Sequence, residues 1–269
     1  MRVMTEFRDQ DLSGVRIEDV DLGGASVYGV RLEDAEMRKI EVVGGSARWV
    51  QIEGTRMRGV ELVDVSISGE LRNVVINGVD IGPLIDAELD RRMPEWAKMR
   101  PEDVAGFREA WSILERLWDE SVARARRLPE ADLHIGVDGE WSFIQTLRHL
   151  NFAHGAWIER MVLGHLTPWH PLDLPWDEAP GWEGIPWDKD ARPGLDEVLV
   201  ERRRHQEAMR GVLASLTEEM LAGEISRDEP GWPRLKDFSF KQCLYIIVKE
   251  EWEHRLYAER DLALLEAGD

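Results

Sequence analysis

A five-residue period governs the first third of the chain. From Phe7 to Ile67 an apolar residue recurs at every fifth position, and after one dropped residue the period resumes at Leu71. A helix repeats every 3.6 residues and a strand every two, so a period of five fits neither. The series comprises Phe7, Leu12, Ile17, Leu22, Val27, Leu32, Met37, Val42, Ala47, Ile52, Met57, Leu62, Ile67, Leu71, Ile76 and Ile81.

The period predicts a chain that turns a corner in every repeat. Side chains at the periodic position and two residues before it are expected to point inward, and the leftover residue forces a bend two residues after it. Most of these corner positions hold Gly, Asp or Asn, which tolerate tight turns, whereas Lys39 and Trp49 break the rule. The conforming corners are Asp9, Gly14, Asp19, Gly24, Gly29, Asp34, Gly44, Gly54, Gly59, Asp64, Asn73 and Gly78.

Residues 5–82 resemble the pentapeptide-repeat family in this register. The resemblance implies a right-handed, four-sided β-helix of about four coils. The positions two residues before the periodic ones hold more Val than the Ala usual in the family, which indicates a wider or less regular coil. Solenoids of this kind bury one apolar column and need caps at their ends, so we expect a short helix over residues 83–93 to close one end.

The chain is acidic, with 53 Asp and Glu against 34 Lys and Arg and a net charge of −19. This balance argues against nucleic-acid binding, which needs clustered basic residues. Some acidic pentapeptide-repeat proteins imitate DNA and bind topoisomerases, but the charges here are interspersed, which favours a scaffold or interaction role. No run reaches the ~18 apolar residues of a membrane span. The first residues lack an apolar signal region, so we expect a cytoplasmic protein without membrane contact.

Helical periodicity replaces the five-residue period from Pro101 onward. Four helices are predicted, over residues 102–128, 142–163, 195–216 and 239–266. The second and fourth open with a Ser-x-x-Gln capping box, and four helices of this length predict an antiparallel bundle. The expected fold is α+β and multidomain: a right-handed quadrilateral β-helix over residues 1–84, a linker with a short helix over 85–100, and a four-helix bundle over 101–269.

The fourth predicted helix carries a pair of metal-ligand residue types. Glu250 and His254 are four residues apart, so both project from one face of the helix and could bind one ion. His149 and His154 of the second helix are five residues apart, about 140° around the axis, and cannot face one site together. By spacing alone, a solvated Glu–His pair on a charged helix is the commoner alternative.

Residues 101–266 resemble the DinB-like (YfiT-like) four-helix family, particularly its actinobacterial branch and the zinc domain of mycothiol-dependent maleylpyruvate isomerase. The matching stretches are GEWSFIQTLRHL and CLYIIVKEEWEHRLYAERDL. In that family a histidine of the second helix and two residues four apart on the fourth hold one metal ion. The resemblance therefore implies a divalent metal, zinc or alternatively nickel, on His149, Glu250 and His254. Many members have a third histidine at the position of Glu250, but the isomerase has glutamate there as well.

The resemblance leaves two functions from different classes open. The favoured one is a metal-dependent thiol S-transferase, in which a low-molecular-weight thiol of the mycothiol or bacillithiol type becomes a thiolate and attacks an electrophile. In the alternative, the metal is structural, the bundle is not catalytic, and the acidic β-helix binds a protein partner. The single cysteine, Cys243, fits a buried core residue better than a residue of the pocket. Bundles of this family often dimerise, which adds a homodimer to the expected partners.

A long, proline-rich connection separates the second and third predicted helices. Connections of this length often act as lids or binding loops. We expect Trp169 and Trp176 of the connection, with Trp141 and Trp252 near the ligands, to line a substrate pocket. His170 is the candidate acid–base or substrate-contact residue, although simple packing between prolines explains it as well.

Overall fold

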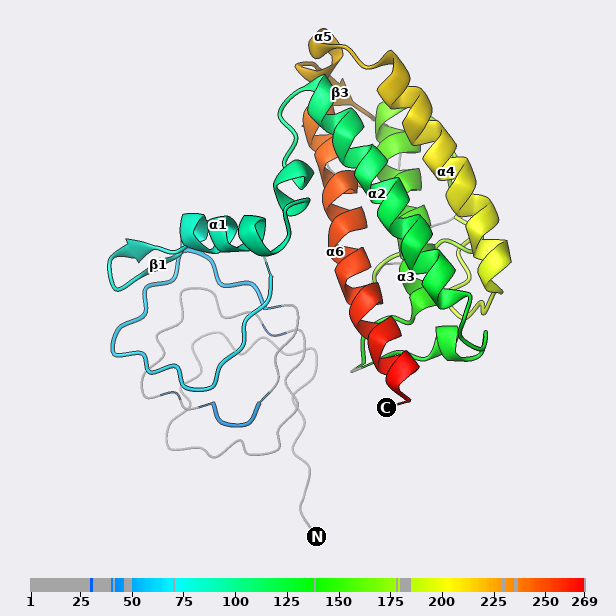
Figure 1. Cartoon of the computed structure of the whole chain (residues 1–269). Helices are drawn as coiled ribbons and strands as arrows, with labels where there is room; N and C mark the ends of the chain where they lie inside the picture. The colour runs from blue at the N-terminus through cyan, green and yellow to red at the C-terminus, as the bar shows by residue number, and fades with distance from the viewer. Residues whose placement is uncertain are drawn as a thin grey trace. The chain divides into compact units, whose positions relative to one another are not determined.

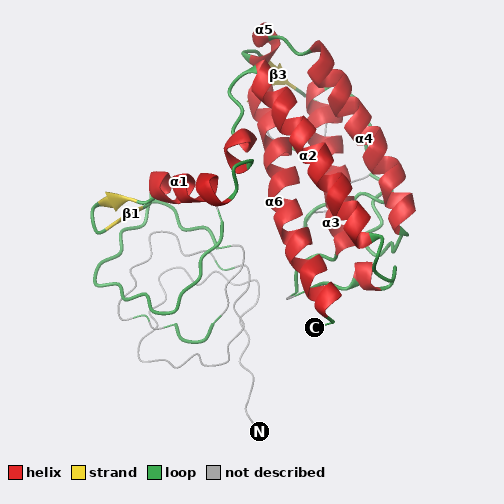
Figure 2. Cartoon of the chain, in the orientation of Figure 1, coloured by secondary structure: helices red, strands yellow, loops and turns green. Residues whose placement is uncertain are grey.

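The computed structural model describes residues 30, 40, 42–45, 50–69, 71–137, 139–177, 179, 185–228, 231–234 and 237–268. The chain divides into two compact units, residues 1–67 and 68–269, and each is described by itself (Figure 1). Helices make up most of the described part of the second unit (Figure 2).

The five-residue period of the first unit is present in its backbone. The chain bends at Gly44, Gly54, Gly59 and Asp64, and each of these residues has a positive φ, from 54° to 64°. All four are corner positions, and Gly, Asn and Asp adopt a positive φ most readily. The prediction of corners is therefore confirmed at the described positions. About half of the predicted β-helix, residues 1–84, lies outside the described residues. The described half shows no β-helix, since no strand is assigned within residues 50–69 and the β1–β2 hairpin is its only sheet.

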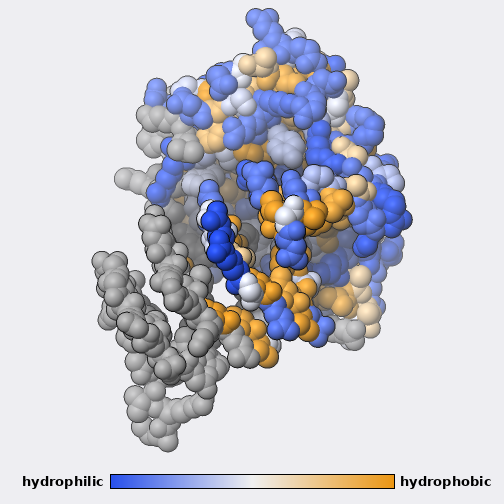
Figure 3. All heavy atoms as spheres, turned by 90° about the vertical axis from the view of Figure 1, so that its left-hand side faces the viewer, coloured by the Kyte–Doolittle hydropathy of each residue, from blue (hydrophilic) through white to orange (hydrophobic). Residues whose placement is uncertain are grey.

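The apolar positions of the period are exposed in the described part of the first unit. Val42, Ile52, Met57, Leu62 and Ile67 keep between 61% and 80% of their surface accessible. Figure 3 shows hydrophobic side chains at the surface among hydrophilic ones. The expectation that the periodic side chains point into a buried column is not met at these five residues. Such a column is closed by contacts between successive coils, and the described residues of this unit form no strand ladder.

A hairpin and a short helix lie near the start of the second unit. β1 (Val75–Ile76) pairs antiparallel with β2 (Val79–Asp80). Between them Asn77 and Gly78 have φ values of 52° and 83°, as a tight two-residue hairpin turn requires. α1 (Gly82–Arg92) follows with Pro83 in its first turn, where a missing backbone N–H leaves no hydrogen bond unmade. The predicted short helix is thus confirmed.

The bundle follows, and its long helices begin at the predicted caps. The elements in chain order are η1 (Trp96–Met99), α2 (Val104–Ala125), η2 (Asp132–His134), α3 (Phe143–His154), the π-helical η3 (Gly155–Val162), α4 (Leu195–Ser215), α5 (Glu218–Leu221), β3 (Glu224–Ser226), β4 (Asp237–Ser239) and α6 (Phe240–Ala267). Ser142 and Gln145 make both hydrogen bonds of a capping box before α3. Before α6, the Ser239 hydroxyl accepts from the backbone N–H of Gln242. These side chains satisfy N–H groups that the first helical turn leaves without a partner.

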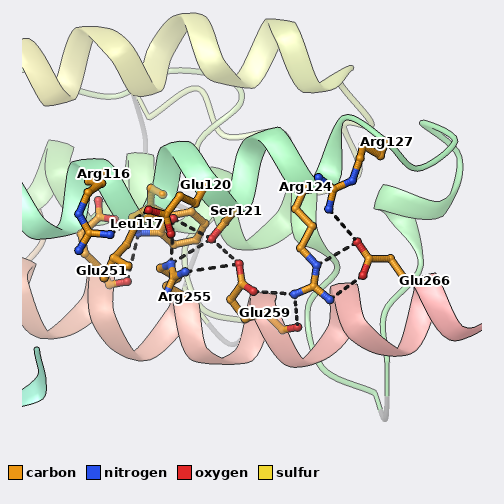
Figure 4. Close-up of polar contacts among 11 residues, drawn as sticks. Arg116, Leu117, Glu120, Ser121, Arg124, Arg127, Glu251, Arg255, Glu259 and Glu266 are labelled. Atoms are coloured by element: carbon orange, nitrogen blue, oxygen red, sulfur yellow. Dashed lines mark hydrogen bonds and ion pairs between the residues drawn. The ribbon is translucent and has the colours of Figure 1, made fainter. Parts of the chain in front are cut away.

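α2 and α6 run in the same direction along their contact. At their starts Lys241 pairs with Glu102 at 2.5 Å. At their ends Arg124 contacts Glu259 at 2.6 Å and Glu266 at 2.7 Å. Figure 4 shows Arg124 between these two glutamates, part of a polar seam that joins the helices. The two helices are therefore parallel neighbours.

α3 and α4 are parallel as well. The Asn151 side chain donates to the Val198 carbonyl at 3.4 Å, and further along both helices Arg204 donates to Glu159 at 2.5 Å. The connection between η3 and α4 thus returns along the bundle before α4 begins. This long return path is the reason that α4 starts at the same end as α3, since only short connections force neighbours to be antiparallel.

The other two helix contacts are antiparallel. α6 opposes α3: His149 near the start of α3 meets His254 far along α6, whereas Trp157 in η3 packs on Phe238, just before α6. α2 opposes α4, because Arg108 near the start of α2 donates to the Leu213 carbonyl near the end of α4. The prediction of a wholly antiparallel bundle is therefore wrong for two of its four contacts. No described helix is both long and apolar enough to cross a membrane.

Candidate metal centre

Three metal-ligand side chains from two helices converge on one point of the bundle. Glu250 and His254 lie one turn apart on α6, and His149 faces them from α3. Their ligand atoms all lie within 4.8 Å of one another. Glu250 Oε2 is 3.0 Å from His254 Nε2 and 3.6 Å from His149 Nε2. The antiparallel contact of α3 and α6 thus brings together the three residues that the family resemblance implied.

A main-chain carbonyl orients the His149 ring. His149 Nδ1 lies 3.0 Å from the carbonyl oxygen of Leu174, which belongs to the connection between η3 and α4. Because a carbonyl can only accept, this contact requires the proton on Nδ1. Nε2 is then the unprotonated nitrogen and faces Glu250 and His254. A hydrogen bond from the second ring nitrogen is the usual support of a metal-binding histidine.

An indole ring packs against the cluster. The centroid of the Trp141 ring lies 4.4 Å from that of His149 and 5.9 Å from that of His254. Its Nε1 donates to Asp177 Oδ1 at 3.3 Å, so the ring is held by the connection as well. The predicted place of Trp141 beside the ligands agrees with this geometry.

The protonation states of the cluster suit a cation. The His149 and His254 side chains are 12% and 16% exposed, and that of Glu250 is 34% exposed. Burial lowers the pKa of His149 and so favours the neutral ring. Burial alone would raise the pKa of Glu250, but its contacts with the His149 and His254 rings outweigh burial and hold this pKa well below its ordinary value. A neutral imidazole and an ionised carboxylate are the forms in which both groups bind metal.

The family of the chain follows from its sequence. A family model described as DinB superfamily matches residues 113–258, more than half of the chain. The chain belongs to the DinB superfamily. The matched range includes all three candidate ligands, and the superfamily is typically metal-binding. No curated protein and no solved structure matches the chain.

The DinB helices also hold a buried charge network directly beside the candidate ligands. Glu251 is fully buried and pairs with Arg202 of α4 at 2.6 Å and with His154 of α3 at 2.8 Å. Burial alone would raise the pKa of Glu251, but Arg202 and His154 outweigh it and lower the pKa to about 2. His154 thus faces the core and not the cluster, as its spacing from His149 predicted.

The ring of Phe152 links two of the predicted pocket tryptophans, Trp169 and Trp176, to the cluster. The rings of Trp169 and Trp176 lie 5.9 and 6.1 Å from that of Phe152, whose own ring is 5.8 Å from His149. Trp252 lies elsewhere. Its side chain is buried in the DinB core, 5.6 Å from the ring of Trp96. The pocket prediction for Trp252 is wrong, because two residues along a helix from Glu250 turn its side chain to another face.

His170 lines a different cavity from the one predicted. A surface cavity of about 510 Å³ is bordered by His170, Glu159, Glu201 and Arg204, and none of the three candidate ligands borders it. Its polar groups pair with one another. Arg204 lies 2.5 Å from Glu159 and 2.9 Å from Glu201, and His170 Nε2 lies 3.8 Å from Glu201. The expectation that His170 reaches the metal cluster is therefore not met.

Cys243 lies in the hydrophobic core and is fully buried. Burial raises the pKa of its thiol to about 12, so the thiolate is not formed at neutral pH. The prediction of a core cysteine is confirmed. The contacts that sequence reasoning missed are those of Leu174 and Asp177. A main-chain carbonyl carries no signal in the sequence, and an aspartate in a loop is too common to single out.

Proposed function

We propose that the DinB domain binds one divalent metal ion through His149, Glu250 and His254, with zinc as the first candidate and nickel as the alternative. The convergence of two imidazole nitrogens and one carboxylate oxygen within 4.8 Å supports this. Two nitrogens and one oxygen are a donor set typical of zinc sites in which three protein ligands leave one coordination position open.

We further propose that the site acts on a low-molecular-weight thiol of the mycothiol or bacillithiol type and transfers it to an electrophile. A divalent ion bound here favours the thiolate form of a thiol that enters the open position. The chain has one cysteine, and its burial and raised pKa remove it as the nucleophile. The reacting sulfur must therefore come from the co-substrate. Trp141, packed on His149 and His254, supplies an apolar wall beside it.

A second proposal concerns the repeat segment. Positive φ at Gly44, Gly54, Gly59 and Asp64 recurs at the spacing that a pentapeptide-repeat β-helix requires. On this ground we propose that residues 1–84 form such a β-helix of about four coils, joined through residues 85–100 to the bundle of 101–269. Its acidic surface would serve as a scaffold for a protein partner, with the DinB domain keeping a structural metal. A homodimer through the bundle is part of the same proposal.

Elemental analysis of the purified full chain tests the metal proposal first. The wild type should carry metal at about one ion per chain, and His149→Ala and His254→Ala should each lose most of it. His165→Ala is the matched control, because His165 is exposed and outside the cluster, and it should keep the ion. Equal metal content in all four proteins, or none in the wild type, would overturn the proposed site.

Thiol consumption tests the transferase proposal. The metal-loaded full chain is incubated with mycothiol or bacillithiol and a chlorobimane electrophile, and the fluorescent adduct is followed over time. The wild type and His165→Ala should accelerate its formation, and Glu250→Ala should not. A metal-loaded wild type that leaves the uncatalysed rate unchanged with both thiols would favour the scaffold proposal.

A further inference from the structure

Arg148, the residue before His149, is a buried cation surrounded by main-chain carbonyls. Its side chain is only 1% exposed. In the described part of the chain its guanidinium donates to carbonyl oxygens and not to carboxylates. The acceptors are the carbonyls of Leu172 at 2.7 Å, Ala191 at 2.6 Å, Lys189 at 3.4 Å and Asp188.

These carbonyls come from two separate stretches of the connection between η3 and α4. Leu172 belongs to the first stretch, and Asp188, Lys189 and Ala191 belong to the second. Arg148 therefore ties both stretches to α3 with one side chain. The stretches also bond to each other, since the Asp188 N–H donates to the Pro171 carbonyl at 2.9 Å. A planar group with five donors in a fixed fork suits this task, and a lysine ammonium cannot reach the same set of acceptors.

The main chain of α3 continues the same attachment toward the candidate metal centre. The Leu174 N–H donates to the Arg148 carbonyl at 3.2 Å, and the Leu174 carbonyl accepts from His149 Nδ1 at 3.0 Å. The guanidinium holds Leu172, two residues before Leu174. Arg148 thus holds the stretch that carries the Leu174 oxygen, the acceptor of the Nδ1 proton.

We propose that Arg148 is a positioning residue of the metal centre, acting through the Leu174 carbonyl to keep the His149 proton on Nδ1 and to present Nε2 to Glu250 and His254. The metal-binding part of this inference rests on the proposed function, whereas the tautomer part concerns the protein without metal. Residues that orient a ligand histidine typically change metal affinity about 10- to 100-fold when they are replaced.

Nitrogen NMR of the histidine rings in the metal-free full chain tests the tautomer directly. In the wild type His149 should carry its proton on Nδ1. In Arg148→Lys and in Arg148→Gln a substantial share of the Nε2-protonated form should be present. Arg108→Lys is the matched control, because Arg108 likewise donates to main-chain carbonyls, those of Leu213 and Leu216, in a contact of α2 with the end of α4. Its His149 signal should match the wild type, and an unchanged tautomer in both Arg148 variants would overturn the proposal.

Metal affinity, measured by competition with a chromophoric chelator, supplies the second arm. Arg148→Lys should bind zinc about 10- to 100-fold more weakly than the wild type, and Arg108→Lys less than about 3-fold more weakly. The same pair of substitutions is then compared in a His149→Glu background, where the ligand has no ring proton to orient. There Arg148→Lys should lose little further affinity. An equal loss in both backgrounds would make Arg148 a purely structural residue. A wild type that binds neither zinc nor nickel would overturn the proposed function, and the tautomer measurement would still decide the role of Arg148.

Discussion

Arg202 and Glu251 form a two-point ion pair inside the bundle, with Nη2 to Oε2 at 2.6 Å and Nη1 to Oε1 at 3.1 Å. Both side chains are at most 3% exposed, and the guanidinium lies 4.6 Å from the ring of Trp118. Glu251 directly follows Glu250 on α6. Glu250 thus belongs to the candidate metal cluster, and Glu251 holds α6 to α4 through the core.

Removing the Glu251 carboxylate should be strongly destabilising. Glu251→Ala leaves Arg202 as a buried charge without its partner, which costs about 3–5 kcal/mol of unfolding free energy. Urea unfolding of the full chain, followed by tryptophan fluorescence, measures the change. Glu109→Ala is the control: its pair with Lys98 is half exposed on both sides and should change stability by less than about 1 kcal/mol. The double variant Arg202→Met, Glu251→Leu should recover much of the loss, and a double variant no more stable than Glu251→Ala would contradict this account.

Of the two adjacent glutamates, the sequence predicts the role of Glu250 but not that of Glu251. Helical spacing pairs Glu250 with His254, and the family resemblance adds His149 from another helix. Neither source indicates that Glu251 is buried, because its partners Arg202 and His154 come from distant parts of the chain. On a charged helix such a residue has the pattern of a solvated one.

The features of the fold likewise separate into those that local sequence signals predict and those that depend on contacts between distant parts of the chain. Local signals, such as the hydroxyl of Ser142 and the glycine and aspartate corners, predicted helix starts and bends correctly. The direction of α4 depends on the path of a long connection, and that path is held by Arg148 through carbonyls that have no side-chain signature. Trp252 and His170 were misplaced for the same reason, since the face a side chain meets is a property of the assembled bundle.

Asp173 should make stability fall as pH rises through neutrality. Burial raises the pKa of its carboxyl to about 8, from an ordinary value of 3.8. The folded chain therefore keeps a proton that the unfolded chain loses, and the resulting stabilisation is present below pH 3.8 and lost as the pH approaches 8. Asp173→Asn mimics the protonated form. The unfolding free energy of the wild type minus that of the variant should therefore decline by a few kcal/mol between pH 4 and pH 8, at about 1.4 kcal/mol per unit of pKa shift.

The measurement for Asp173 is urea unfolding at a series of pH values. Asp119→Asn serves as the control, because Asp119 is exposed on α2 and should leave the pH profile unchanged. The geometry leaves a buried charge at position 173 poorly compensated: Oδ2 accepts one hydrogen bond, from the His170 N–H at 2.8 Å, but Oδ1 has no hydrogen-bond partner in the described part of the chain. Parallel pH profiles for the wild type and Asp173→Asn would show that the carboxyl is ionised in the fold.

Cys243 should behave as a core residue in solution. Its thiol is fully buried, and its pKa is raised to about 12. Ellman's reagent should therefore react with it only after unfolding in urea, whereas a second cysteine introduced by Ser112→Cys, at an exposed site on α2, should react at once in the native chain. Cys243→Ala should cost about 1–3 kcal/mol of stability through the cavity it leaves. Zinc affinity should stay at the wild-type value, and a loss of zinc binding in Cys243→Ala would contradict a purely structural role.

Removing the metal should lower the melting temperature only in a chain whose candidate ligands are intact. A ligand that binds only the folded chain at about 100 times its dissociation constant adds about 2.7 kcal/mol of stability. For a domain of this size that corresponds to a shift on the order of 5–10 °C. EDTA should therefore lower the transition of the wild type by this amount and leave the double variant His149→Ala, His254→Ala unchanged. Tryptophan fluorescence reports the bundle, because all tryptophans except Trp49 and Trp96 lie in residues 101–269. His165→Ala should respond to EDTA like the wild type. A shift of equal size in the double variant would place the stabilising metal at some other part of the chain.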